Sequence, residues 1–406
     1  MRAYERFIRY AQVHTTSDPS TGTHPSTPRQ FTLARMLAEE LKGLGLADAR
    51  VDEHCYVYAS LAAASGCEGA PALGLIAHMD TANDASGEGV QPRLFPNYDG
   101  GSVELGHGVT LDTERFGFLK TLKDQTLITS DGSTLLGADD KAGIAEIMTA
   151  LERIQAEGLP HGRLCIGFTP DEEIGEGASL FDIPAFGAAY AYTVDGGDVG
   201  ELEYQNFNAA AAVVSFRGFS VHPGSAKGLM VNAQNLAMEF HAALPAAERP
   251  EHTEGWEGFF HLTSMTGTVS GAKLGYIVRD HDRQKFEARK QAMQRIAEDM
   301  NARYGAGTVA LTLRDSYYNM EEKILPHFHL IENAQKACRM AGLEPVILPI
   351  RGGTDGATLS HMGLPCPNLG TGGFNFHGPC ECITAEKMDQ ATDVLVHLAA
   401  LYAKAE

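Results

Sequence analysis

The stretch ALGLIAHMD (residues 72–80) is a short apolar run that stops abruptly at a histidine and an aspartate. A continuous apolar run of this length is typical of a strand that is buried on both faces of a parallel sheet. Apolar residues followed by acids recur at residues 135–140, 163–173 and 189–197, and apolar side chains have helical spacing over residues 144–154. Because strand and helix patterns alternate, we predict an α/β domain with a mostly parallel central sheet and helices on both faces.

Residues 208–318 follow a different pattern. Strands are predicted at residues 209–216, 259–268, 274–279 and 308–314, and helices at residues 230–244 and 283–304. This β-α-β-β-α-β order is that of the split βαβ, or ferredoxin-like, unit. The sequence therefore predicts an inserted α+β domain at residues 208–318, which interrupts a larger domain formed by residues 1–207 and 319–406.

The structure of three further segments of the larger domain can be predicted from local patterns. Glycine and proline punctuate residues 84–131 without helical periodicity, so this segment is predicted as loop and hairpin, and its length suggests a functional insertion. Helices are predicted at residues 323–340 and 384–404.

Composition and charge limit the partners of the chain. The 406 residues are 44% hydrophobic and 21% charged, which is ordinary for a globular protein and excludes disorder along its whole length. The formal net charge of −20 argues against binding to nucleic acid. No apolar run approaches the roughly 18 residues of a membrane span, and the first residues lack the apolar stretch of a signal peptide. We therefore expect a cytoplasmic protein without a membrane partner.

The cysteines indicate neither a disulfide framework nor a thiolate metal site. There are seven of them, an odd number, and they are scattered along the chain without a CxxC pair. Cys380 and Cys382 lie close to His377 in the sequence, but no role is assigned to them.

Acids and histidines gather where the predicted strands end. They are His78, Asp80, Asp139, Asp140, Glu172, Glu173 and Asp195, and His377 follows in a glycine-rich stretch. Each of these residues alone is more often a helix cap, a turn residue or an ordinary histidine. Together they would meet at the edge of the sheet where open α/β sheets bind ligands. Crowded carboxylates repel one another, and divalent cations relieve that repulsion. Two imidazoles with several carboxylates favour zinc, with cobalt or manganese as alternatives.

Adjacent Glu172 and Glu173 indicate hydrolysis. One of two neighbouring glutamates can bind a metal ion while the other holds a water molecule and moves its proton. A metal ion lowers the pKa of such a water molecule, so the pair suits hydrolytic chemistry.

Nine short motifs resemble those of the co-catalytic zinc peptidases of the M20-type aminoacylase/carboxypeptidase clan, and within it the peptidase T (tripeptide aminopeptidase) family. They are AHMDT (77–81), LGADDKAG (136–143), TPDEE (169–173), YTVDGG (192–197), HPGSAKG (222–228), MVNA (230–233), RDHD (279–282), IRGGTDG (350–356) and NFHG (375–378). The resemblance runs from about residue 4 to the end of the chain. It implies a metal-dependent aminopeptidase with two zinc ions per subunit, and an inserted domain that acts as a lid and forms a homodimer.

The resemblance also implies roles for the residues that match its motifs. His78 and Asp195 would bind one zinc ion, Glu173 and His377 the other, and Asp139 would bridge the two. Glu172 would be the general base, and Asp80 would orient His78. A cis Asp139–Asp140 peptide bond is also implied. His222 would bind the oxyanion, in the active site of the partner subunit.

Two arginines are candidates for binding the carboxylate of a peptide substrate. Arg279 and Arg351 offer the bidentate fork that suits a carboxylate, although either could instead form a structural salt bridge. Asn232 is a candidate for a further polar contact. If the arginines bind the terminal carboxylate, their distance from the zinc ions would select tripeptides. The alternatives are another amidohydrolase of the clan, such as a deacylase or dipeptidase, and a peptide-binding protein without turnover.

Overall fold

The computed structural model describes residues 1–403, so Lys404, the last residue of the predicted closing helix, lies outside the described part. The chain divides into two compact units. The larger unit contains Met1–Tyr204, Glu322–Leu348 and the residues from Thr354 onward, and the smaller unit contains Gln205–Glu321 and Pro349–Gly353. These boundaries lie within three residues of positions 207 and 319, but residues 349–353 cluster with the smaller unit rather than with the larger one.

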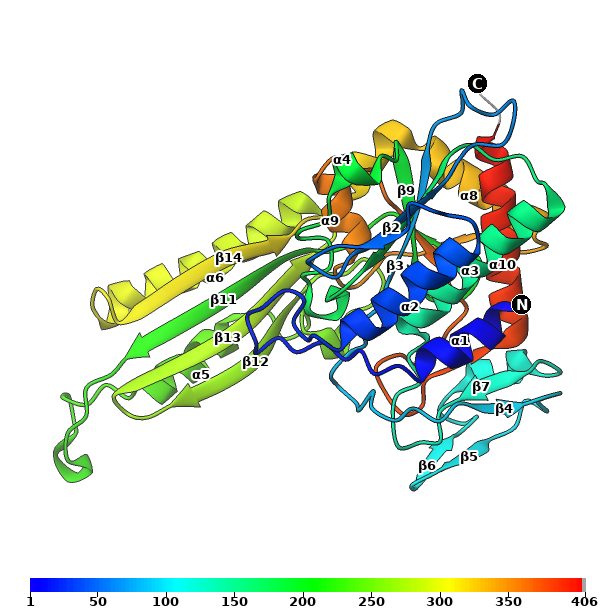
Figure 1. The fold of residues 1–406 in the computed structure, drawn as a ribbon. Helices are drawn as coiled ribbons and strands as arrows, with labels where there is room; N and C mark the ends of the chain where they lie inside the picture. The colour runs from blue at the N-terminus through cyan, green and yellow to red at the C-terminus, as the bar shows by residue number, and fades with distance from the viewer. Residues whose placement is uncertain (404–406) are drawn as a thin grey trace. The chain divides into compact units, whose positions relative to one another are not determined.

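The core of the larger unit is an eight-stranded sheet (Figure 1). In spatial order its strands are β1 (Arg50–Val51), β2 (Val57–Leu61), β8 (Leu164–Thr169), β3 (Leu73–His78), β9 (Tyr190–Gly196), β16 (Asn368–Gly370), β10 (Glu201–Glu203) and β15 (Val346–Ile347). The four central strands β8, β3, β9 and β16 are parallel, whereas β2 and β10 pair with them in antiparallel orientation. Every residue of β3 and β8 is buried, as expected for strands covered on both faces. The predicted mostly parallel sheet is confirmed.

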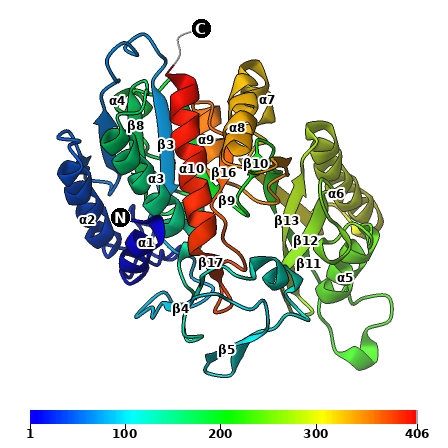
Figure 2. The same cartoon turned by 90° about the vertical axis from the view of Figure 1, so that its right-hand side faces the viewer.

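Helices cover both faces of this sheet. On one face α3 (Ala138–Glu157) contacts β3 and β9, and α1 (Ala3–Ala11) and α10 (Ala385–Tyr402) pack against α3 (Figure 2). On the other face Phe186 of α4 (Ile183–Phe186) and Leu359 of α9 (Asp355–His361) pack in one buried cluster with Ile76 of the sheet. In the part of the chain that the structure describes, no helix combines the length and the apolar composition required to cross a bilayer.

Outside these two layers and the smaller unit, the remaining helices are α2 (Gln30–Gly43), which packs against β2, and a broken helical segment that begins at Glu321. The predicted single helix over residues 323–340 is wrong. The segment instead forms α7 (Glu321–Ile324), the 3₁₀ turn η5 (Leu325–His327) and α8 (His329–Met340). The helix breaks at Pro326, because proline has no N–H to donate within a helix.

Residues 84–131 form more structure than the loop and hairpin predicted for them. The hairpin is present as β5 (Val103–Gly106) and β6 (Val109–Leu111), and a small sheet places β7 (Leu127–Thr129) between β4 (Arg93–Phe95) and β17 (Cys382–Thr384). The 3₁₀ helix η1 (Gly117–Leu122) contributes two leucines to a separate apolar cluster, whose members are Tyr98, Leu105, Leu111, Leu119, Leu122, Leu127 and Cys382. Because β17 follows the segment that carries His377, this insertion supports one side of the candidate site.

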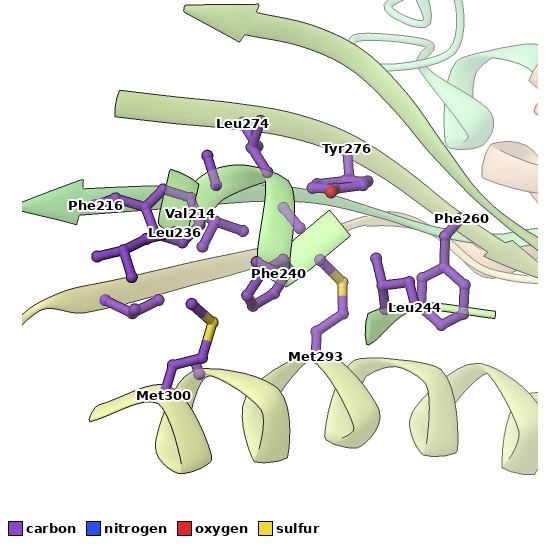
Figure 3. Packing of buried hydrophobic residues seen from close by; sticks show 14 of the residues in the cluster. Val214, Phe216, Leu236, Phe240, Leu244, Phe260, Leu274, Tyr276, Met293 and Met300 are labelled. Atoms are coloured by element: carbon purple, nitrogen blue, oxygen red, sulfur yellow. The ribbon is translucent and has the colours of Figure 1, made fainter. Parts of the chain in front are cut away.

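The smaller unit has the predicted split βαβ order. Its elements are β11 (Asn208–Arg217), α5 (Ala233–Ala243), β12 (Phe259–Gly267), β13 (Gly271–Asp280), α6 (Arg283–Tyr304) and β14 (Val309–Tyr317). The sheet is antiparallel, in the order β12-β13-β11-β14. Alternate residues of β11 and β13 are buried against α5 and α6, where Phe216, Phe240 and Met293 meet in the core (Figure 3). This two-residue period is typical of a sheet with helices on one face only.

Glu146 of α3 is a buried acid that we expect to lower stability at neutral pH. Neither of its carboxyl oxygens has a hydrogen-bond partner among the described residues. Burial raises its pKa well above the usual 4.5, so the folded chain keeps the proton that the unfolded chain releases. The free energy of unfolding therefore falls as the pH rises above that value. Glu146→Leu should raise the free energy of unfolding at pH 7 by about 1–3 kcal/mol. Denaturant unfolding should show a smaller gain at pH 4, and equal gains at both pH values would contradict the prediction.

Candidate metal centre

The five predicted metal ligands all belong to the larger unit and come from five separate segments. His78 is the last residue of β3, Asp195 lies near the end of β9, and Glu173 lies in the 3₁₀ turn η2 (Glu172–Ile174) that follows β8. Asp139 lies at the beginning of α3, and His377 lies in the loop after β16. Since β3, β8, β9 and β16 are parallel, their carboxyl ends meet at one edge of the sheet.

Asp139 lies at the centre of this group and faces a histidine through each of its oxygens. His78 Nε2 is 2.9 Å from Asp139 Oδ1, and His377 Nε2 is 3.1 Å from Asp139 Oδ2. Each histidine has a second carboxylate of its own: His78 Nε2 is 3.4 Å from Asp195, and His377 Nε2 is 3.0 Å from Glu173. The structure thus contains two nitrogen-and-oxygen sites that share the Asp139 carboxylate.

The electrostatics of this group suit divalent cations. No lysine or arginine of residues 1–403 forms an ion pair with Asp139, Glu173 or Asp195. Burial raises the pKa of Glu173 to about 7 and that of Asp195 to about 6, while Asp139 and Glu173 raise the pKa of His377 to about 11. The buried Oε1 of Glu173 also lacks a hydrogen-bond partner within the described part of the chain. These side chains therefore bind protons at their raised pKa values, and bound divalent cations would compensate the same negative charge in place of the protons.

Asp140 is a buried acid of this group to which the sequence assigns no role. Its Oδ2 accepts the backbone N–H of His78 at 3.1 Å, and its Oδ1 is buried without a partner among the described residues. It is close enough to His78 and Asp195 for the three to hold one ion. The Asp139–Asp140 peptide bond is cis, as the resemblance implied. The sequence places Asp140 among the acids that follow the predicted strands, but it does not indicate these contacts.

Asp80 connects His78 to the two glutamates. It is fully buried, and its carboxylate accepts the backbone N–H groups of Glu172 at 3.0 Å and Glu173 at 3.2 Å. His78 Nδ1 is 3.2 Å from the Asp80 carbonyl oxygen and 3.4 Å from its carboxylate. An acceptor at Nδ1 fixes the ring and leaves Nε2 to face Asp139 and Asp195.

Glu172 has a carboxylate that no described residue engages in a hydrogen bond, although its backbone is held by Asp80. Burial, followed by the nearby Asp195, raises the pKa of Glu172 well above its usual value. Bound cations would act in the opposite direction and favour the ionised form. A partly buried carboxylate without a protein partner, next to this group, is placed to hold a water molecule.

The segment before Asp139 is not the end of a strand, contrary to the prediction for residues 135–138. These residues belong to no sheet: the N–H of Leu135 donates to the carbonyl of Ser86 at 3.0 Å, and a side chain accepts the N–H groups that follow. Glu381 Oε2 accepts the N–H groups of Leu136 at 2.7 Å and Gly137 at 2.8 Å, and its Oε1 accepts that of Asp139 at 3.1 Å. Glu381 was missed in the sequence, where it lies between the two cysteines that received no role.

His222 and Asn232 lie in the smaller unit. His222 is exposed and precedes the 3₁₀ turn η3 (Pro223–Ser225), where its Nδ1 accepts the N–H of Gly224 at 3.1 Å. With Nδ1 as an acceptor, the neutral ring carries its proton on Nε2 and can donate from there. Asn232 is the N-cap of α5, because its Oδ1 accepts the N–H of Gln234 at 3.0 Å.

The two arginines also lie in the smaller unit, and neither forms a salt bridge with a described carboxylate. Arg351 donates through Nη1 to the carbonyl of Gly255 at 2.6 Å and through Nη2 to Thr253 Oγ1 at 3.0 Å. Arg279 donates through Nη1 to the carbonyl of Arg351 at 2.9 Å, but its buried Nε has no partner in the described chain. Arg279 therefore has a buried donor that no described residue accepts.

Known proteins resemble this chain along nearly its whole length. The peptidase dimerisation domain family matches residues 204–308. The peptidase T of Geobacillus sp. (strain WCH70) is 52% identical over 401 residues, which are 98% of this chain and 98% of that protein.

Solved structures share the fold. A tripeptidase from Staphylococcus aureus subsp. aureus Mu50 aligns with a TM-score of 0.79 and 22% identity over 99% of this chain and 98% of its own. The Bacillus subtilis YXEP protein, a dinuclear metal-binding peptidase from the M20 family, aligns with a TM-score of 0.64 and 15% identity over 98% of both chains. These two likenesses concern the fold, whereas the 52% identity to the Geobacillus protein extends to the sequence itself. The chain belongs to the peptidase T family.

Proposed function

We propose that this chain is a di-zinc aminopeptidase that removes the N-terminal residue from short peptides, preferentially tripeptides. The observation that carries the proposal is the Asp139 carboxylate, which faces His78 through one oxygen and His377 through the other. Membership of the peptidase T family and the name of the Geobacillus relative support a peptide as the substrate. The match to a peptidase dimerisation domain supports a homodimer, and we expect it in the cytoplasm.

The metal ligands are assigned from their neighbours. His78 and Asp195 would hold one zinc ion, Glu173 and His377 the other, and Asp139 would bridge both. Imidazole nitrogen and carboxylate oxygen without thiolate form a donor set that zinc accepts. When bound at these residues, zinc would polarise the scissile carbonyl and lower the pKa of the attacking water molecule.

The protein side chains would move the protons and bind the substrate. Glu172 would take a proton from the attacking water and deliver it to the leaving amine. His222 would donate from Nε2 to the oxyanion, since its Nδ1 is already an acceptor. Arg279 and Arg351 would form the clamp for the terminal carboxylate, and the carbonyl of Arg351 would hold Arg279 in place. Asn232 would add a polar contact.

The proposal is tested by kcat/KM for matched di-, tri- and tetrapeptides before chelation, after chelation and after zinc is restored. We expect hydrolysis of the tripeptide to be preferred, to disappear with the chelator and to return with zinc. A tripeptide with an amidated C-terminus should lose at least tenfold in kcat/KM, and an unchanged value would contradict the carboxylate clamp. Preferred cleavage of dipeptides or N-acyl amino acids would indicate another activity of the clan. Absence of metal-dependent turnover would overturn the proposal.

A further inference from the structure

Glu381 is a buried acid whose carboxylate binds only backbone N–H groups. Its side chain is 1% exposed, and no lysine or arginine of residues 1–403 pairs with it. Three N–H groups converge on its two oxygens, those of Leu136, Gly137 and Asp139, at 2.7–3.1 Å. Charge-assisted hydrogen bonds of this kind are stronger than neutral ones, so they hold the backbone of this segment firmly.

One of the three donors is the N–H of Asp139 itself. The other two precede it, so the carboxylate binds the chain on the approach to the carboxyl group that faces both histidines. No strand pairs with residues 135–137: the N–H of Leu135 donates to the carbonyl of Ser86 at 3.0 Å, and Glu381 accepts those of Leu136 and Gly137. Glu381 is therefore the side chain that binds the backbone leading to Asp139.

Glu381 is also part of the loop that carries His377. Its own N–H donates to the carbonyl of Gly378 at 3.0 Å, and Asn375 Nδ2 donates to the carbonyl of Cys380 at 3.2 Å. Phe374 and Cys382 close this loop through two backbone hydrogen bonds of 2.8 and 3.0 Å. Since β17 begins at Cys382 and pairs with β7, Glu381 is held by a sheet directly behind it.

We propose that Glu381 is a positioning residue that sets the separation between Asp139 and His377, and so the affinity of the chain for the ion these two residues share. Asp139 and Glu381 are 242 positions apart in the chain, and the hydrogen bonds between them join the two segments that would meet at that ion. Glu381 touches neither metal nor substrate and acts through Asp139 and His377. The inference rests on the proposed function, because it requires that metal bind there.

The test compares Glu381→Gln with Glu386→Gln in the full chain. The amide introduced by Glu381→Gln would turn an N–H group toward backbone N–H donors, so at least one hydrogen bond becomes a repulsive contact. Glu386 is a matched control, because its carboxylate also accepts a backbone N–H, that of Thr126 at 2.7 Å, and it lies only five positions away. The measurements are zinc affinity by competition with a chromophoric chelator, the visible absorption spectrum of the cobalt-loaded chain, kcat and KM for a tripeptide, and the melting temperature.

We expect Glu381→Gln to weaken the binding of one zinc ion by about 10- to 100-fold, the range known for residues that orient metal ligands. The cobalt spectrum should change, and kcat should fall more than KM changes, while Glu386→Gln leaves all three as they were. Wild-type zinc affinity and cobalt spectrum in Glu381→Gln would overturn the inference, even if its melting temperature fell. If Glu381→Gln does not fold, Glu381→Asp, which keeps the charge and withdraws the carboxylate, undergoes the same measurements. A wild-type chain that binds no metal would overturn the proposed function as well, which separates the two failures.

Discussion

Replacing Glu172 by glutamine is expected to lower kcat for a tripeptide by about 10²- to 10⁴-fold, the usual contribution of a general base. The Glu172 carboxylate has no hydrogen-bond partner among the described residues, so the substitution disrupts no internal contact. Asp80 holds only the backbone N–H of Glu172, which glutamine retains. An amide cannot take a proton from water, and zinc should remain bound because His78, Glu173 and Asp195 are untouched.

Steady-state kinetics and the zinc content of the purified protein check this expectation. Glu176→Gln is a matched control, since Glu176 is an exposed glutamate only four positions away in the same part of the chain. The control should keep its activity and its metal. If Glu172→Gln kept full activity, Glu172 would not be the base. If Glu172→Gln lost its zinc, Glu172 rather than Glu173 would be the metal-binding member of the pair.

Replacing Asp139 by alanine is expected to abolish measurable hydrolysis and to weaken zinc binding by at least about 100-fold. Loss of a residue that only orients a ligand already costs about 10- to 100-fold, and Asp139 would bind both ions directly. Its two oxygens lie 2.9 and 3.1 Å from the two histidine rings, and alanine offers no oxygen to either of them. A folded chain that binds zinc tightly is stabilised against heat by that binding.

Zinc should therefore raise the melting temperature of the wild-type chain but not that of Asp139→Ala. Asp389→Asn serves as the control. Asp389 is an exposed carboxylate that pairs with Arg2, and it belongs to no candidate site. Its melting temperature should rise with zinc as in the wild type. A full zinc-dependent rise in the melting temperature of Asp139→Ala would contradict the bridging role of Asp139 and indicate that zinc binds without it.

Much of the fold could be predicted because its signals are local. The apolar runs that become β3 and β8 are continuous since both faces of the strands are covered, and the two-residue period of β11 and β13 follows from helices on one face only. The break at Pro326 was also readable from one residue, although the apolar spacing on both sides concealed it. The small sheet of β4, β7 and β17 was not predictable, because strands of three residues carry too little periodicity and β17 comes from the far end of the chain.

The candidate site divides in the same way. His78, Glu172, Glu173 and Asp195 lie at or near the ends of apolar strands, and that local pattern predicts a common edge of the sheet. The hydrogen-bond partners of Arg279 and Arg351 could not be predicted from the sequence, because they are carbonyl groups that the fold brings to the two guanidinium groups.

Residue types and their spacing in the chain are sufficient for the α/β class, the inserted ferredoxin-like unit and the nitrogen and oxygen donors of the candidate metal centre. They are insufficient for the partners of those donors. The hydrogen bond from the N–H of His78 to Asp140, and that from the N–H of Asp139 to Glu381 across 242 positions, became evident only once the chain was folded. The physical reason is that hydrophobic periodicity is a property of neighbouring residues, whereas a hydrogen bond to a backbone N–H depends on where two distant segments meet, and no local pattern encodes that meeting point.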